Sequence, residues 1–309
     1  MRRVAKILIT GIAGGIGRLV AERLHGEHEV IGIDRSPWRD APPSIRVHRL
    51  DLRKRQFEDI VRTEQPDTII HMAFVRHFRG DPAVRHEVNV QGTRRLLEHA
   101  AAYDVGKVVV VSSAYVYGAL ADNPRYVAED HPLNVSRNFP ELRDLAEVEG
   151  VVGAFLWRYP DIATSILRPV NTLGRDTNSA VGRYLDLDIV PTVMGFNPMM
   201  QFIHEQDLAD AVCLAVEKGL RGIFNVAGPS AVPLHTAIAE IGRRHLPLLD
   251  PVAHAIIAGL FRLNIYGFPA GALDFIKYSC TVCDDPFREA TGFVPRKMLA
   301  EIFASIRRK

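Results

Sequence analysis

Cysteine and long apolar runs are scarce in this sequence. It contains three cysteines among 309 residues, an odd number that is too small for a disulfide framework. No apolar run reaches the roughly 18 residues that a membrane-spanning helix needs, and the first residues lack the pattern of a signal peptide. We therefore expect a reduced, cytoplasmic protein that does not span a membrane.

An excess of charge of either sign is also missing. The 38 basic and 36 acidic residues leave a formal net charge of +2, which argues against nucleic acid or an anionic membrane as the main partner. No metal site is expected, because Cys280 and Cys283 form a lone Cys-x-x-Cys and zinc would need about two more ligands. We therefore expect a small molecule as the partner.

Apolar segments are abundant, and in the first half of the chain they alternate with amphipathic stretches. The short apolar runs lie at residues 4–10, 29–34, 45–50, 68–71, 107–113 and 163–168. Strands that alternate with helices indicate βαβ units, and continuous apolar strands indicate a parallel sheet covered on both faces. After Pro169 the expected elements become shorter, and glycine, proline and asparagine become more frequent.

These patterns predict an α/β fold with a Rossmann-like, doubly wound parallel sheet and a smaller, less regular C-terminal lobe. We expect residues 1–170 to form the sheet domain. Residues 171–309 would form the lobe, which shares some elements with the main sheet and binds the substrate.

A glycine-rich turn follows the first apolar run. Gly11 allows a tight turn, Gly14 lets the backbone approach a pyrophosphate, and Gly17 lets a helix pack closely on the strand. The helix that starts here would offer unpaired N–H groups and a partial positive charge to that anion. The spacing therefore predicts a dinucleotide site.

An acidic residue, Asp34, closes the next apolar run at about the distance expected for a ribose ligand. Its carboxylate would accept hydrogen bonds from the ribose hydroxyls and repel a 2′-phosphate, which favours NAD. The neighbouring Arg35 leaves NADP open, because a guanidinium can hold a 2′-phosphate.

The turn resembles that of the extended short-chain dehydrogenases/reductases, the group of NAD-dependent nucleotide-sugar epimerases and dehydratases. Ordered matches to this family continue along nearly the whole chain, more than chance would produce. They are Thr10–Gly17, Asp51–Leu52, His71–Phe74, Asn89–Thr93, Ser112–Gly118, Arg168–Gly174 and Phe202–Ala209.

The resemblance implies which residues serve the cofactor and which serve catalysis. The residues that it assigns to the dinucleotide are Gly11, Ala13, Gly14, Gly15, Ile16, Gly17, Asp34, Arg35, Asp51, Leu52, Met72, Ala73, Phe74, Asn89, Ser112, Pro169 and Thr172. In the family, a serine holds the reacting oxygen, and Ser113 matches it. A tyrosine is the general acid/base, and a lysine four residues later lowers its pKa.

That tyrosine and lysine are missing. In the helix that should carry them, Glu141 replaces the tyrosine and Leu145 replaces the lysine; a shift of one turn would place Asn138 or Phe139 at the tyrosine position, and neither is an acid/base. Glu141 is either a replacement acid/base or an exposed carboxylate at a helix start, and Leu145 fits an ordinary apolar helix face. Tyr117 or a substrate group would otherwise move the proton. Tyr103 with Lys107 is the only literal Tyr-x-x-x-Lys, and it precedes the strand that carries Ser113.

A second departure concerns the substrate. Many nucleotide-sugar enzymes have an arginine just before the segment that starts at Phe202, where it grips the diphosphate. Residues 197–201 carry no charge here, although Arg175 or Arg183 could substitute. An apolar or aromatic small molecule would suit the side chains of this region, if they face a cleft: Met194, Phe196, Met199 and Met200. Alternatively, the methionines fill gaps in the core.

Two functions stay open. The first is an atypical NAD(P)-dependent oxidoreductase or epimerase that acts on a small hydroxyl or carbonyl substrate. The second is a catalytically silent dinucleotide-binding sensor or partner subunit. The resemblance also implies a homodimer, because family members pair through two long helices, expected here at residues 84–102 and 141–159.

Overall fold

The computed structural model describes residues 4–75, 81–177, 179–263 and 269–306. It contains a seven-stranded sheet with the order β10-β6-β5-β4-β1-β2-β3, in which all neighbours are parallel. Its strands are β1 (Lys6–Thr10), β2 (Glu29–Asp34), β3 (Arg46–Arg49), β4 (Thr68–His71), β5 (Lys107–Val111), β6 (Ala163–Pro169) and β10 (Gly222–Val226). The predicted doubly wound sheet is confirmed.

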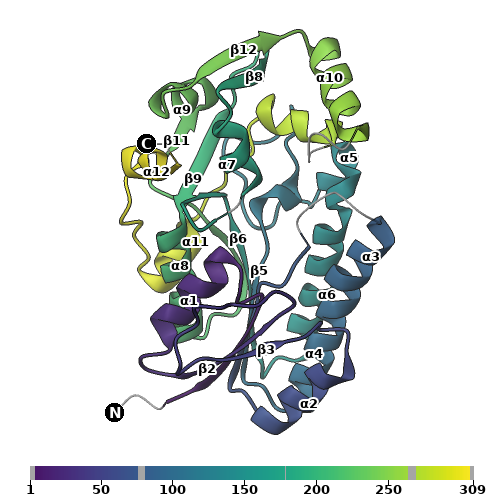
Figure 1. Cartoon of the computed structure of the whole chain (residues 1–309), viewed down its shortest axis with the longest axis vertical. Helices are drawn as coiled ribbons and strands as arrows, with labels where there is room; N and C mark the ends of the chain where they lie inside the picture. Colours follow the sequence, from purple (N-terminus) through teal and green to yellow (C-terminus); the bar gives the residue numbers. More distant parts are fainter. Residues whose placement is uncertain (1–3, 76–80, 178, 264–268, 307–309) are drawn as a thin grey trace.

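Helices cover both faces of this sheet (Figure 1). The side chains of each strand alternate between the two faces, so that Leu8 packs with one helix layer while Ile7 and Ile9 pack with the other. The layer against Leu8 consists of α2 (Arg55–Glu64), α4 (Gly92–Ala102) and α6 (Arg143–Arg158). The opposite layer consists of α1 (Gly15–Leu24), α8 (Glu205–Lys218) and α11 (Asp285–Thr291). Covering both faces explains why the central strands are continuously apolar.

A smaller lobe with its own apolar core lies beyond the carboxyl ends of the strands (Figure 1). Its strands form two small sheets: β7 (Asn171–Leu173), β9 (Met199–His204) and β11 (Ala231–Pro233) in one, β8 (Ile189–Val193) and β12 (Arg244–Leu248) in the other. Its helices are α7 (Ala180–Leu185), α9 (Leu234–Glu240), α10 (Asp250–Arg262), η4 (Ala270–Ile276) and α12 (Leu299–Ile306). Because β10 pairs with β6, residues on both sides of the expected boundary at 170 build the main sheet.

Short helical turns complete the chain. They are α3 (Pro82–His86), η1 (Glu87–Gln91), η2 (Ala114–Tyr117), α5 (Val135–Asn138) and η3 (Pro140–Leu142). The helix expected at 84–102 is thus divided among α3, η1 and α4, and the one expected at 141–159 begins as η3 before α6. Among the described helices, none is both long and apolar enough to cross a bilayer.

A buried ion pair joins the sheet to α6. Arg168 in β6 and Glu149 in α6 have side chains that are 3% and 1% exposed, with Nη2 and Oε2 2.5 Å apart. Ser112, just after β5, donates from its hydroxyl to Glu149 Oε1 at 2.5 Å. Arg168 Nη1 donates to the hydroxyl of Tyr117 at 2.6 Å, and that hydroxyl donates to Oδ1 of Asn225 in β10 at 2.7 Å. One polar network therefore connects β5, β6, β10 and α6.

Loss of one charge from this pair should strongly destabilise the fold. Glu149→Gln leaves the Arg168 guanidinium buried without a counter-charge, which should lower the free energy of unfolding by about 3–5 kcal/mol in urea denaturation. The matched control is Glu147→Gln on the same helix, where the carboxylate is half-exposed and pairs with Arg143. There we expect less than about 1 kcal/mol. Equal losses for the two variants would contradict this account.

Candidate functional site

The turn between β1 and α1 is built for glycine. Gly11 has a φ of +76°, and a Cβ there would lie 2.7 Å from the carbonyl carbon of Met72. A Cβ on Gly17 would lie 2.3 Å from the carbonyl oxygen of Gly11. No side chain caps α1, whose N-cap is Gly14. The N–H groups of its first turn can therefore receive an anion.

A carboxylate lies beside this turn. Asp34, at the end of β2, accepts the backbone N–H of Ala13 at 3.0 Å and that of Ser36 at 2.8 Å. Each oxygen keeps a further lone pair for a ribose hydroxyl. Glycines at the close approaches of the turn, N–H groups without a side-chain cap at the start of α1 and the carboxylate of Asp34 together fit a dinucleotide.

The side chain of Arg35, which follows Asp34, lies near a different carboxylate. Arg35 Nε lies 3.8 Å from Oδ2 of Asp51. Arg53 donates to Asp51 at 2.8 Å, and this hydrogen bond is the main cause of the lowered pKa of Asp51. Leu52 is buried in the core below these charges. Asp34 is thus bonded to the backbone of the glycine turn, while the guanidinium of Arg35 lies near the carboxylate of Asp51.

The segment after β4 is held rigidly beside the glycine turn. His71 lies between the hydroxyls of Thr10 and Thr93, with ring nitrogens at 2.7 and 2.9 Å. Burial lowers the pKa of His71 to about 3, so the ring is neutral at physiological pH. Asn89 receives the N–H of Val75 on its Oδ1 at 2.8 Å. These bonds fix the backbone of the predicted cofactor contacts, Met72, Ala73 and Phe74.

The predicted nicotinamide end follows β5 and β6. Ser113 is half-buried, and its hydroxyl accepts the N–H of Tyr115 at 3.2 Å. Pro169 ends the neighbouring strand, and Thr172 donates to the carbonyl of Val170 at 3.2 Å. The carboxyl ends of parallel neighbours lie at one edge, so Ser113 and Pro169 lie along the same edge as the glycine turn. Ser112 faces away into the buried network.

Tyr117 has a structural role in place of the catalytic one expected from the sequence. It is fully buried, and its hydroxyl is bonded to Arg168 and Asn225. Burial raises its pKa to about 12. A phenol with both partners inside a closed network cannot reach a substrate.

Glu141 and Leu145, the residues at the expected tyrosine and lysine positions, have different surroundings. Glu141 is half-buried within η3, before α6 begins. Leu145, one turn further, packs against the main apolar core. Leu145 therefore fits the ordinary apolar helix face that the sequence indicated.

Tyr115 was missed by the motif analysis, although it lies two residues after Ser113. Its phenol donates to Oδ1 of Asn171 at 2.6 Å, and its ring centroid lies 4.5 Å from that of Phe275. Burial raises the pKa of Tyr115, so the phenol stays protonated. Tyr115 thus links the loop of Ser113 to the strand that follows Pro169.

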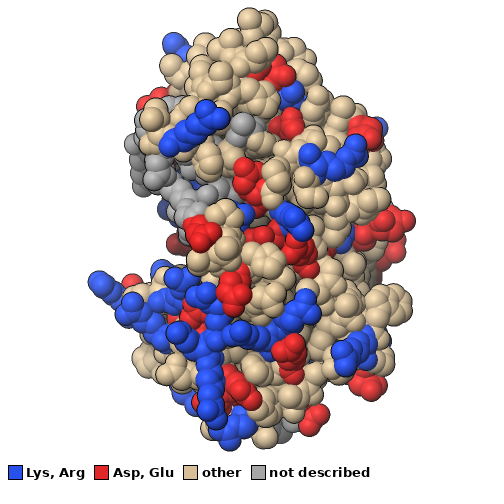
Figure 2. All heavy atoms as spheres, turned by 90° about the vertical axis from the view of Figure 1, so that its right-hand side faces the viewer, with Lys and Arg blue, Asp and Glu red and all other residues tan. Residues whose placement is uncertain are grey.

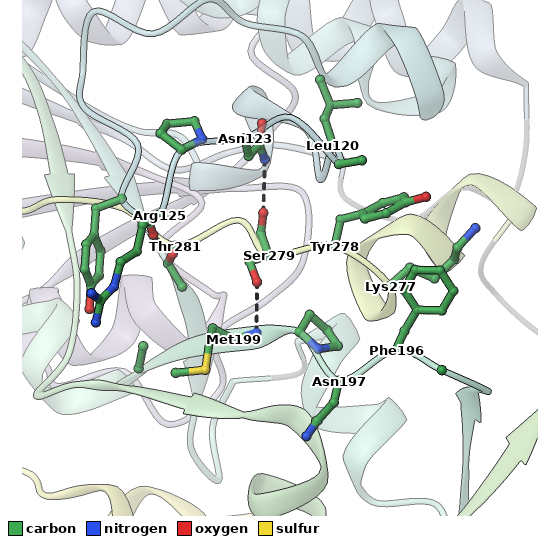
Figure 3. Close-up of a pocket in the computed structure, with 16 residues that line it drawn as sticks. Leu120, Asn123, Arg125, Phe196, Asn197, Met199, Lys277, Tyr278, Ser279 and Thr281 are labelled. Atoms are coloured by element: carbon green, nitrogen blue, oxygen red, sulfur yellow. Dashed lines mark hydrogen bonds between the residues drawn. The ribbon is translucent and has the colours of Figure 1, made fainter.

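A cavity of about 510 Å³ lies between residues 120–126, 195–199 and 277–281 (Figure 3). Phe196 and Met199 line it, whereas Met194 is 52% exposed elsewhere and Met200 is buried in the core of the lobe. Neither Arg175 nor Arg183 is among the described lining residues. Of the four side chains expected to suit an apolar substrate, two therefore line the cavity and two do not.

Two cations of this cavity were not anticipated. Lys277 donates to Asp250 at 2.9 Å and lies 5.3 Å from the ring centroids of Phe196 and Tyr278. Burial is the largest single influence on the pKa of Lys277 and lowers it, but the hydrogen bond to Asp250 and the negative charges of Asp250 and Asp274 together outweigh burial, so the net pKa is raised. Arg125 is exposed at the other end. These residues are far apart in the sequence and belong to no motif, so only the fold reveals them.

The cavity is held together by hydrogen bonds between its walls (Figure 3). Asn123 donates to the carbonyl of Ser279 at 3.1 Å, and the hydroxyl of Ser279 accepts the N–H of Met199 at 2.9 Å. Among the described residues, no group of three or more side chains is placed to hold a metal ion.

Comparison with known proteins agrees with this geometry. Residues 7–227 match the sequence profile of the NAD dependent epimerase/dehydratase family. The uncharacterized protein Rv0501 of Mycobacterium tuberculosis is 31% identical over 254 residues, which is 78% of this chain and 67% of the relative. A UDP-glucose 4-epimerase of Bacillus subtilis is 29% identical over 269 residues, 74% of this chain and 77% of that one.

The fold is shared with solved members of the same group. The structure of a Thermus thermophilus UDP-glucose 4-epimerase in complex with NAD superposes with a TM-score of 0.76, at 21% identity and 97% coverage of each chain. NAD is the cofactor of this group. The chain belongs to the NAD dependent epimerase/dehydratase family.

Proposed function

We propose that the protein binds NAD at the glycine turn and catalyses redox chemistry at a hydroxyl-bearing or carbonyl carbon of a small molecule. It would act as an oxidoreductase or epimerase with a non-standard acid/base. The observation that carries the proposal is the shared sheet edge that holds the glycine turn, Asp34 and Ser113. When bound, NAD supplies hydride exchange.

The residues of the chain would divide the remaining work. The N–H groups at the start of α1 hold the pyrophosphate, and Asp34 holds the adenosine ribose. The Ser113 hydroxyl donates to the reacting oxygen of the substrate, while its other contact, the N–H of Tyr115, keeps it oriented.

Glu141 is the group that we propose for proton transfer. It occupies the position of the family tyrosine and is half-buried near the start of α6. Tyr115 is the weaker candidate, because its phenol is bonded to Asn171 and its pKa is raised by burial. A phenol with a raised pKa is a weaker proton donor near neutral pH, and while it is protonated it cannot act as a general base.

The cavity supports a substrate other than a UDP-sugar. Met200, which precedes Gln201 and Phe202, is buried, so no cation stands where the diphosphate arginine would. The cavity instead presents the aromatic side chains Phe196 and Tyr278 beside Lys277. A small hydroxylated molecule with an apolar ring or an anionic group suits this lining.

The absence of the family tyrosine and lysine also favours a second function. With glutamate and leucine in place of tyrosine and lysine, the protein could retain NAD without turnover and serve as a sensor or partner subunit. Detectable turnover with any hydroxyl or carbonyl substrate separates the two functions.

Cofactor binding can be tested by titrating NADH and NADPH with fluorescence detection. The unmodified protein should bind NADH more tightly than NADPH. Asp34→Ala removes an acceptor of the ribose hydroxyls and should weaken NADH roughly tenfold, with a smaller effect on NADPH. Asp40→Ala, an exposed carboxylate on the same connection, is the control. A larger loss for NADPH would overturn the preference for NAD.

Proton transfer can be tested by following NADH formation with a panel of alcohols and sugars. Glu141→Ala should abolish turnover and leave NADH affinity unchanged, because Glu141 is proposed to move only the proton. Glu147→Ala on α6 should retain turnover. If Glu141→Ala is active, the proton takes another route. Robust 4-epimerase activity of the unmodified protein on UDP-glucose would show that the catalytic helix has been misassigned.

We also propose a homodimer formed through α4 and α6. Trp157 on α6 is 81% exposed. A groove between the helices is lined by four small or apolar residues and two charged ones: Val90, Gly150, Val151, Ala154, Arg94 and Glu147. Figure 2 shows this side of the molecule: Lys and Arg side chains gather in a dense band at its lower left, and uncharged side chains cover much of the surface to the right of the band and above it.

Light scattering should give the mass of a dimer at micromolar concentration. Ala154→Arg should yield a monomer, because it places a charge in the groove. Glu22→Arg, on α1 at the opposite face of the sheet, should remain dimeric. A monomeric unmodified protein would remove this proposal.

A further inference from the structure

A buried carboxylate holds the loop that follows β7. Glu205, the first residue of α8, is buried, and its oxygens accept three successive backbone N–H groups. These belong to Arg175 at 2.9 Å, Asp176 at 3.0 Å and Thr177 at 2.8 Å. Hydrogen bonds to an ionised acceptor are about twice as strong as neutral ones, so residues 174–177 are tied firmly to α8.

Two glycines make room for this arrangement. A Cβ on Gly174 would lie 1.9 Å from the carboxyl carbon of Glu205, so only glycine admits the carboxylate beneath the loop. A Cβ on Gly15 would lie 2.1 Å from the carbonyl oxygen of Asp176. The loop therefore packs against the backbone of the first turn of α1.

The loop contacts the protein at the proposed cofactor site. The first turn of α1 carries the N–H groups that we assign to the pyrophosphate of NAD. α1 and α8 pack side by side on one face of the sheet, so the loop spans from α8 to the mouth of the cofactor site (Figure 1).

We propose that Glu205 is a positioning residue that clasps residues 174–177 over the first turn of α1 and thereby slows the release of the dinucleotide. The proposal rests on the cofactor site proposed above. Glu205 need not touch the cofactor, because it acts through the three N–H groups of the loop.

The same helix offers a matched control. Asp207 is also buried in the first turn of α8, and its carboxylate also accepts backbone N–H groups, those of Arg296 and Lys297, at 3.1 Å each. It anchors a different loop. Asp207→Asn therefore reports the general effect of weakening a carboxylate anchor on α8.

The rate of NADH release tests whether Glu205 slows the loss of the cofactor by holding residues 174–177. The protein is loaded with NADH, mixed with excess NAD⁺, and followed by stopped-flow fluorescence. Glu205→Ala should accelerate NADH release by roughly tenfold or more, the effect of losing hydrogen bonds to a charged group. Glu205→Gln keeps one acceptor oxygen and should give an intermediate rate. Asp207→Asn should release NADH at the rate of the unmodified protein.

The rate of trypsin cleavage after Arg175 measures how firmly the loop is held, and this measurement does not need the cofactor. The side chain of Arg175 is exposed, but the backbone that follows is bonded to Glu205. Glu205→Ala and Gly174→Ala should both be cut faster than the unmodified protein, since the second variant expels the carboxylate that the first removes. Asp207→Asn should be cut at the original rate.

The outcomes separate this inference from the proposed function. If the unmodified protein binds no NADH, the proposed function fails, and a clasp on NAD fails with it even where cleavage shows that Glu205 holds the loop. If NADH binds but Glu205→Ala and Glu205→Gln release it at the original rate, the clasp is wrong and the cofactor site stands. Should Glu205→Ala not fold, Glu205→Gln and Gly174→Ala carry both measurements.

Discussion

The buried ion pair between Arg168 and Glu149 fixes the position of α6 relative to the sheet edge on which the site depends. An isolated buried charge is costly, so neither partner can be lost alone. Ser112 adds the end of β5 to the pair, which leaves the next residue, Ser113, at the edge. This constraint explains how α6 keeps its place although the tyrosine and lysine of the family are absent from it.

Residues of the same helix therefore carry separate tasks. Glu149 holds the helix to β6, whereas position 141 carries the half-buried carboxylate that we propose as the acid/base and position 145 makes an apolar contact. The dinucleotide end shows no comparable departure from the family pattern, since the glycine turn and Asp34 have the geometry that a dinucleotide site requires. The proposed cofactor site thus follows the family pattern, whereas the position of the acid/base does not.

The sequence predicted the parts of the structure that short segments of the chain encode, namely the glycine turn and the strands of the main sheet. The glycine turn and the strands could be predicted because each has a signature within a short segment of sequence: the positive φ at Gly11 and the tight spacing at Gly11 and Gly17 for the turn, and the apolar runs for the strands. Long-range contacts could not be read in this way. The burial of Tyr117 depends on Asn225 in β10, and the approach of Lys277 to the cavity depends on how η4 packs.

The central claim is that NAD lies along the sheet edge with Ser113, and without a tyrosine, at its reactive end. A crystal structure of the protein with NAD tests this most directly. We predict the pyrophosphate on the first turn of α1, the ribose on Asp34, and the nicotinamide C4 facing Ser113 with Glu141 as the nearest acid. A dinucleotide bound elsewhere, or a tyrosine hydroxyl within hydrogen-bonding distance of the substrate position beside Ser113, would contradict the account.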